Sequence, residues 1–274
     1  AHIKSAMSEQ ADFTFVYTVD SKGDKVWHEL RGTPYFCEEG QFCGYRGAGR
    51  DITQERRAAH EITQLQEVVM HAMASLAETR DNETGNHIIR TKNYVKLLAE
   101  QLRTHPRFKD FLSNQYIEQL YKSAPLHDIG KVGIPDNILC KPGKLTTEEF
   151  EIMKTHTTVG YEAIERAEKA LGIELDFLQH AKDIALYHQE KWDGSGYPMG
   201  LKGDDIPFSA RLMALADVYD ALISERVYKP PFSHDYAVEL ITEGQGSHFD
   251  PDVTAAFLSI HEQFRAIALE FADE

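Results

Sequence analysis

Apolar and polar residues alternate with a period of two in the first part of the chain. Apolar or aromatic residues occupy every second position from Phe13 to Val19, which is the pattern of a half-buried strand. Turn-forming residues at 20–24 and 38–41 separate this segment from two further strand-like segments. The predicted strands are 13–19, 25–30 and 42–47. Such a small antiparallel sheet is too small to bury a sizeable core alone.

A helical pattern replaces the alternation after Asp51-Ile52-Thr53. Thr53 is suited to cap the N-terminus of a long amphipathic helix over 54–79. Apolar residues in this helix step by four and three, which is typical of a coiled-coil seam. The seam is Ala58, Ile62, Leu65, Val69, Ala72 and Leu76. It predicts either a parallel homodimer through the linker helix or a surface helix packed on its own chain.

From Arg80 onward, helical patterns alternate with loops that are marked by Gly and Pro, such as 130–135 and 193–198. This part is large enough to hold a full hydrophobic core. We therefore predict a mainly α protein, with an all-helical domain, a small N-terminal antiparallel β segment and a long linker helix. The expected divisions are 1–53, 54–79 and 80–274.

Composition narrows the possible partners. The chain has 274 residues and a formal charge of −15, which argues against broad binding of DNA or RNA. Its three cysteines form no spaced framework and fit a reducing, cytoplasmic compartment. No apolar run approaches the length of a membrane span, and no signal peptide is recognisable at the start. A phosphate-bearing ligand would therefore need a local cationic or metallic site.

Several histidines and carboxylates have spacings that suit a metal centre. Asp217 lies in an apolar helical run, where an unpaired carboxylate would cost several kcal/mol. Metal coordination would compensate such a group, and mixed imidazole and carboxylate ligands suit Fe, Mn, Zn or Ni. We place His156 on the helix that runs through 150–154. Each residue alone has an ordinary structural explanation. Together, however, they are more ligands than one ion needs, which indicates a site for two or more metal ions. Such a site can hold the attacking and leaving oxygens in the hydrolysis of a phosphodiester. The candidates are Glu83, His87, His127, Asp128, His156, His188 and Asp217, with Asp220 in a supporting position.

Two longer motifs identify a family. His127–Asp136 (HDIGKVGIPD) and Asp193–Pro198 (DGSGYP) resemble the two signatures of the HD-GYP family. The resemblance continues through further motifs up to 248–251 and covers nearly all of 80–262. It implies a helical HD-superfamily hydrolase that opens the bacterial second messenger cyclic di-GMP to pGpG, GMP or both.

The same resemblance implies roles for individual residues. Two or three divalent ions are expected, Fe or Mn before Ni or Zn, with Asp128 bridging two of them and Glu83 completing a third site. The implied metal ligands are Glu83, His87, His127, Asp128, His156, His188 and Asp217; the implied catalytic residues are Asp128 and Lys131; and the implied phosphate-binding residues are Lys131, Arg226 and Lys229.

One position departs from the family pattern. The family usually reads His-His-Glu where this chain reads His188-Gln189-Glu190, and an amide oxygen is a weaker ligand for iron or nickel than imidazole. Three readings stay open: an active enzyme, which we favour; a weakened or inactive receptor or adaptor that binds cyclic di-GMP or a cyclase partner; and a phosphodiesterase for another cyclic dinucleotide such as cyclic GMP-AMP. Tyr197 and its neighbours form either a tight turn, which we favour, or a contact surface for a diguanylate cyclase (GGDEF) partner.

The N-terminal segment resembles the last part of a PAS sensor domain. The stretches that carry this resemblance are Trp27–Pro34 and Gly44–Thr53, followed at once by the long helix. The first strands of a PAS domain are missing, so we expect Ala1 to lie inside a longer protein in which a PAS sensor regulates the hydrolase.

Overall fold

The computed structural model describes residues 5, 8–21, 23–80, 86–172, 175–225 and 230–273. The chain divides into two compact units, Ala1–Val68 and Val69–Glu274. The prediction of a mainly helical protein with a small antiparallel sheet is confirmed. Among the described residues, no helix combines the length and the apolar character that crossing a membrane requires.

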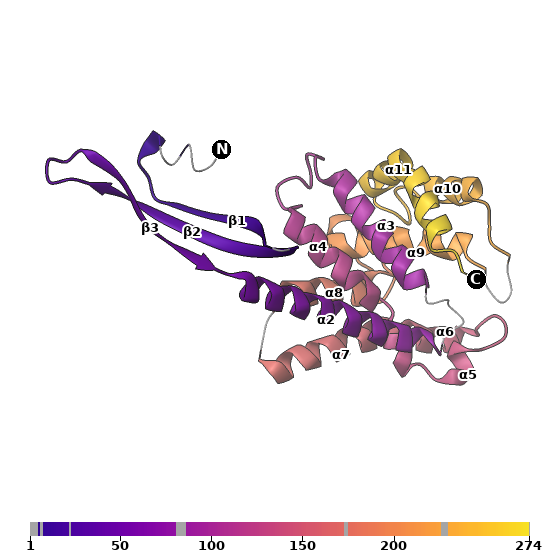
Figure 1. Ribbon diagram of the computed structural model, residues 1–274. Helices are drawn as coiled ribbons and strands as arrows, with labels where there is room; N and C mark the ends of the chain where they lie inside the picture. Colours follow the sequence, from indigo (N-terminus) through magenta and orange to yellow (C-terminus); the bar gives the residue numbers. More distant parts are fainter. Residues whose placement is uncertain are drawn as a thin grey trace. The chain divides into compact units, whose positions relative to one another are not determined.

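The first unit contains a three-stranded antiparallel sheet in the order β1-β2-β3 (Figure 1). Its strands are β1 (Phe13–Ser21), β2 (Asp24–Phe36) and β3 (Phe42–Asp51). They are longer than the alternation predicts, because the pairing between neighbouring strands continues past the alternating residues, as in β2, where Gly32 pairs with Phe13 and Gly47. The Phe13 ring lies over Gly32, where an added Cβ would be 2.3 Å from the ring edge. No apolar side chain described in this unit is fully buried.

Helix α2 (Thr53–Glu78) follows the sheet and begins at Thr53. The expected capping role of Thr53 is wrong, because its hydroxyl oxygen accepts a hydrogen bond from the backbone N–H of Trp27 at 2.8 Å. The carboxylate of Asp51 instead accepts a hydrogen bond from the backbone N–H of Thr53 at 2.9 Å. The helix start is thus tied to the sheet.

Helix α2 has two different apolar faces. All six seam residues are exposed, and the large side chains among them have 54–67% of their surface in contact with solvent. The other face lies on the helical unit: Ala74 and Ala77 are buried, and Met70 packs against a cluster that includes Leu126 and Ile164. The face of α2 that packs within this chain is therefore formed by residues outside the seam.

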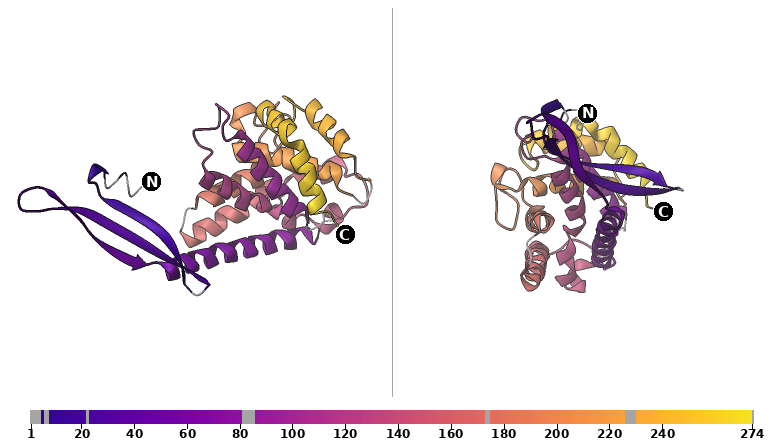
Figure 2. Two further views of the ribbon diagram at one scale, coloured as in Figure 1. Left: turned by 45° about the horizontal axis from the view of Figure 1, so that its top comes forward. Right: turned by 60° about the vertical axis from the view of Figure 1, so that its left-hand side comes forward.

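The second unit is a helical domain (Figure 2). In chain order it contains α3 (Asn86–Leu102), α4 (Asn114–Ser123), η1 (Ala124–Leu126), η2 (Ile129–Gly133), α5 (Asp136–Leu139), α6 (Thr147–Lys154), α7 (His156–Leu171), α8 (Asp176–Tyr187), η3 (Gly203–Asp205), α9 (Phe208–Ile223), α10 (His234–Glu243) and α11 (Pro251–Glu270).

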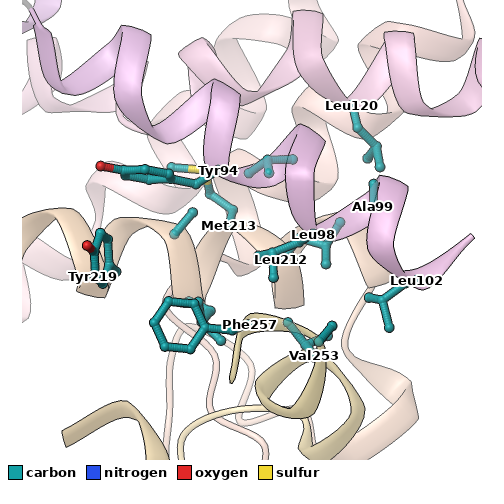
Figure 3. Close-up of a cluster of buried hydrophobic side chains, with 14 of the residues drawn as sticks. Tyr94, Leu98, Ala99, Leu102, Leu120, Leu212, Met213, Tyr219, Val253 and Phe257 are labelled. Carbon is teal, nitrogen blue, oxygen red and sulfur yellow. The ribbon is translucent and has the colours of Figure 1, made fainter. Parts of the chain in front are cut away.

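The core of this domain lies between α3, α9 and α11 (Figure 3). Helix α9 is apolar over most of its circumference, so it occupies the centre. The ring of Tyr94 on α3 stacks on Phe264 of α11 at a centroid distance of 4.4 Å, and it meets the edge of Tyr219 of α9 at 5.2 Å. This packing holds α3 against α9, the helices that carry His87 and Asp217.

Arg80, just after α2, ties that helix to the segment after η1. Its guanidinium donates hydrogen bonds to the carbonyl oxygens of Val132 at 2.5 Å and Ile134 at 3.2 Å. It also forms an ion pair with Asp136 at 2.5 Å. One side chain therefore connects the end of α2 with η2 and the start of α5.

Candidate metal centre

His127 and Asp128 lie in a tight loop between η1 and η2, close to the N-terminus of α7. Gly130 makes this approach possible, because a Cβ at that position would lie 1.9 Å from the carbonyl oxygen of His156. Our placement of His156 on the preceding helix is wrong: α6 ends at Lys154, and His156 begins α7. That break turns the imidazole toward the His127–Asp128 loop.

The structure brings six of the predicted ligands into two groups. In the first cluster (His87, His127 and Asp217), the Nε2 atoms of the two histidines are 3.3 Å apart, and His87 Nε2 lies 3.7 Å from Asp217 Oδ1. In the second cluster (Asp128, His156 and His188), the Nε2 atoms of the histidines are 3.4 Å apart. Asp128 Oδ1 lies 3.4 Å and 3.5 Å from these two nitrogens.

Asp128 lies between the two clusters. Its Oδ2 is 3.3 Å from His127 Nε2, whereas its Oδ1 faces the second cluster. Oδ1 is buried and accepts no hydrogen bond from any residue that the structure describes. A buried carboxylate oxygen without such a partner is costly. One carboxylate thus presents one oxygen to each cluster, which is the geometry that a bridging ligand needs.

All four histidines are oriented by hydrogen bonds at Nδ1. His87 Nδ1 lies 2.8 Å from Asp220 Oδ2. The other three face backbone carbonyl oxygens of Ala124, Met153 and Ile184 at 2.8–3.1 Å. Carboxylate and carbonyl oxygens only accept, so each Nδ1 carries the proton and each Nε2 offers a lone pair. Facing lone pairs repel one another unless a cation lies between them, so the donor set fits divalent metal ions.

Asp220 is the positioning residue of the first cluster. Besides His87, it contacts Arg90, whose Nε and Nη2 donate to its two oxygens at 2.7 Å and 2.9 Å. Burial would raise the pKa of Asp220, but the hydrogen bonds from His87 and Arg90 outweigh it and lower the pKa. The sequence interpretation placed Asp220 in a supporting position and missed Arg90, whose spacing of three residues from His87 was the available signal.

The clusters differ in their proton affinity. Burial disfavours the charged form of His127, but the carboxylates of Asp128 and Asp217 raise its pKa overall. Burial lowers the pKa of His156 to about 4, and the attraction of Asp128 offsets this only in part. Burial also opposes ionisation of Asp128, but Lys131 and His127 hold the pKa of that carboxyl well below its usual range. The Lys131 Nζ lies 2.8 Å from Asp128 Oδ2.

The loop of 193–201 is held by Glu190, a residue that the sequence interpretation did not single out. Its buried carboxylate accepts hydrogen bonds from the backbone N–H groups of Met199, Gly200 and Leu201 at 2.7–3.0 Å. Gln189 is half-buried, and its backbone carbonyl oxygen accepts a hydrogen bond from the backbone N–H of Tyr197 at 3.2 Å. These contacts explain a structural role for the loop.

The remaining predicted residues, Glu83, Arg226 and Lys229, lie outside the described residues. A further group that the sequence interpretation did not find consists of His234, His261 and Glu262. Its histidines hydrogen-bond to each other at 2.9 Å, and Tyr219 hydrogen-bonds to His234 at 2.8 Å. This chain of hydrogen bonds satisfies the imidazoles without a metal.

Comparison with known proteins adds independent information. The HD domain family model matches residues 72–253. A probable cyclic di-GMP phosphodiesterase of Vibrio cholerae is 59% identical over 222 residues, which are 81% of this chain and 50% of the relative. A 3'3'-cGAMP-specific phosphodiesterase 2 of the same organism is 38% identical over 213 residues, which are 78% of this chain and 38% of the relative. The chain thus spans about half the length, or less, of these relatives.

Among solved structures, a cyclic GMP-AMP specific phosphodiesterase of V. cholerae has a similar fold. The TM-score is 0.50 at 20% sequence identity, and the match covers 74% of this chain and 51% of that chain. At this level of identity the likeness concerns the fold alone.

Proposed function

The chain belongs to the HD domain family, and we propose that it hydrolyses cyclic di-GMP to pGpG, GMP or both as a metal-dependent phosphodiesterase. The observation that carries this proposal is the position of Asp128, with one oxygen toward each of two histidine clusters. The 59% identity to a relative named as a probable cyclic di-GMP phosphodiesterase supports the choice of substrate.

The proposed ligands are His87, His127 and Asp217 for one ion, and His156 and His188 for the other, with Asp128 shared. Fe or Mn is the proposed metal, and Ni or Zn the alternative, because imidazole and carboxylate ligands suit these ions. When bound, such ions supply Lewis acidity and a water of lowered pKa. Glu83 as ligand of a third ion, and Arg226 and Lys229 as phosphate-binding residues, remain predictions.

The protein itself supplies position and charge. The Lys131 ammonium lies at Asp128, where it would neutralise charge on the scissile phosphate as the phosphodiester is attacked. Asp220 and the three carbonyl oxygens hold the imidazole rings in the tautomer in which Nδ1 carries the proton and Nε2 can coordinate a metal ion. The four histidines and Asp128 are buried and Asp217 is half-buried, so little water surrounds the ligand atoms.

The decisive experiment is anaerobic turnover of cyclic di-GMP by protein reconstituted with Fe(II) or Mn(II), with the products separated. Hydrolysis that disappears in Asp128→Ala supports the proposal. Cyclic GMP-AMP is assayed in parallel, because faster hydrolysis of that dinucleotide would replace the proposed substrate. Tight binding of cyclic di-GMP without turnover under every metal would favour the receptor reading, which Gln189 suggests.

We also propose that the exposed seam of α2 pairs with a second copy to form a parallel homodimer, and that a PAS sensor regulates activity through this helix. The six exposed seam residues support the pairing, since 4–3 spacing buries them against a partner helix. Leu65→Glu should produce monomers in light scattering, whereas the exposed, off-seam Gln64→Glu should leave dimers. A wild-type protein that is monomeric at high concentration would exclude the dimer. A cytoplasmic location, which the three free cysteines support, and a cyclase partner remain predictions.

A further inference from the structure

An exposed aromatic surface lies directly beside the second cluster. Phe150 of α6 has 44% of its surface exposed. Its ring meets the ring of Tyr197 nearly at right angles, with a centroid distance of 6.0 Å. The Tyr197 ring in turn lies 6.4 Å from the imidazole of His156. The order from the cluster outward is therefore His156, Tyr197 and Phe150.

A cation accompanies the two rings. Lys154 Nζ lies 5.6 Å from the centroid of Phe150 and 5.8 Å from that of Tyr197. Both distances are within the range of a cation–π contact. The same ammonium forms an ion pair with Glu151 at 2.6 Å, so the cation beside these rings is positioned by its own helix and its charge is partly compensated there.

The Tyr197 ring belongs to a firmly held loop. Glu190 accepts three backbone hydrogen bonds from the residues that follow Pro198. On the other side of Tyr197, Gly196 packs against the backbone so closely that a Cβ would lie 2.3 Å from the nitrogen of Lys191. Burial and the nearby carboxylates of Asp128 and Asp217 raise the pKa of Tyr197, so its hydroxyl stays neutral.

On the basis of the proposed function, we infer that the exposed ring of Phe150, bordered by the nearly perpendicular ring of Tyr197, forms a platform on which a purine base of the cyclic dinucleotide stacks while its phosphate lies at the metal clusters. Every base has a π-face, so stacking on an aromatic ring tolerates different bases. The platform therefore contributes affinity for both cyclic di-GMP and cyclic GMP-AMP, and discrimination between them must come from other contacts.

The choice of a base as the occupant follows from position and chemistry. The platform continues outward from His156, so a substrate whose phosphate reaches the second cluster extends over it. A planar ring would stack on the exposed face of Phe150, close to the Lys154 ammonium, which lies 5.6 Å from the centroid of that ring. A partner protein on this surface would instead compete with the dinucleotide for the same residues.

The test compares two phosphodiesters, cyclic di-GMP and bis(4-nitrophenyl) phosphate, which carries no purine. Phe150→Ala should raise KM for cyclic di-GMP by about tenfold, within the range of about 5- to 150-fold that stacking on one aromatic side chain provides. Its effect on the nitrophenyl ester should be much smaller, and Phe150→Trp should lose less than Phe150→Ala. The control is Leu171→Ala, which removes an exposed apolar side chain, 70% of whose surface contacts solvent, at the far end of α7.

A second readout does not depend on turnover. Calorimetric titration of a non-hydrolysable cyclic di-GMP analogue into metal-loaded protein, with and without Phe150→Ala, should show the same loss of affinity. Equal losses on both phosphodiesters, or an unchanged dissociation constant, would overturn the platform. If the wild type cleaves the nitrophenyl ester but not cyclic di-GMP, the proposed substrate fails, and the titration still decides whether Phe150 binds a base.

Discussion

The two clusters are built by different means, although each joins imidazole and carboxylate groups. The first cluster takes His87 and Asp217 from the core helices α3 and α9. Its His87 is oriented by a carboxylate that is itself fixed by Arg90. In the second cluster, His156 begins α7 and His188 directly follows α8, and both are oriented by backbone carbonyl oxygens.

The two clusters should therefore respond differently to mutation of the residues around them. Asp220 and Arg90 orient His87 through their side chains, so substituting them can weaken the first cluster without changing any of its ligands. The backbone carbonyls of the second cluster cannot be mutated, but their position depends on close contacts such as Gly130 against His156. The second cluster also adjoins Gln189, where the chain departs from the family pattern.

The largest effect should come from Asp128→Asn, because this residue presents one carboxylate oxygen to each cluster. We expect loss of bound metal at both and a decrease in turnover of about 10³-fold or more, since metal-ion stabilisation of the transition state contributes several kcal/mol. Metal content by mass spectrometry and product formation measure the two effects. Asp205→Asn, an exposed residue on η3, is the matched control. Retention of both ions would refute the bridging role.

Asp220→Asn should weaken the first cluster and leave the second intact. Loss of such an outer hydrogen-bond partner typically costs about 10- to 100-fold in metal affinity. Disturbing the buried pair with Arg90 should also lower the free energy of unfolding, by up to about 3–5 kcal/mol. Chelator competition and thermal unfolding separate these effects. A loss of metal that is equal at both clusters would show that they do not behave independently.

Acid should distinguish the clusters in metal-free protein. His156 has a pKa of about 4, below its ordinary 6.5, so between these values the unfolded chain binds more protons. Its contribution to the free energy of unfolding therefore falls as the pH drops from 6.5 to 4. The raised pKa of His127 acts oppositely: its contribution is present at low pH and is lost as the pH rises through that pKa. NMR titration, assigned with His127→Gln and His156→Gln, should show His127 protonated where His156 is neutral; coincident titrations would contradict this.

The smallest effect is expected from Gln189→His. An added imidazole beside His188 should increase metal retention at the second cluster by up to about tenfold, because imidazole is the better ligand for Fe and Ni. Dialysis against a chelator, followed by metal analysis, measures this. Gln179→His on the exposed side of α8 is the control. Lower retention would show that Gln189 is itself the preferred residue at this position.

Much of the candidate centre could be predicted from the sequence because its residue types occur in recognisable motifs. The contacts that orient them could not. Three of the four Nδ1 partners are backbone carbonyls, which leave no mark on the side-chain pattern. In the sequence, nothing distinguishes Arg90 from any other arginine on a helix; its role follows only from the fold, in which Asp220 of α9 lies beside it.

In the fold, too, the tertiary packing could not be predicted from the sequence pattern. The helical periodicity of α2 and its seam is evident in the sequence, but which face packs on the domain is decided by Met70 and two small alanines, residues that periodicity weighs little. Similarly, the break between α6 and α7 lies where the backbone of His156 comes close to Gly130, a tertiary contact that periodicity does not reveal.

Arg80 gives the end of α2 a mechanical connection to the centre. Its guanidinium holds the carbonyls of Val132 and Ile134, which lie on the same short segment as Asp128 and Lys131. A displacement of the C-terminal end of α2 would therefore reach the backbone next to Asp128 through this one side chain. Arg80 is thus a direct polar link between the end of α2 and the segment that lies between the two clusters.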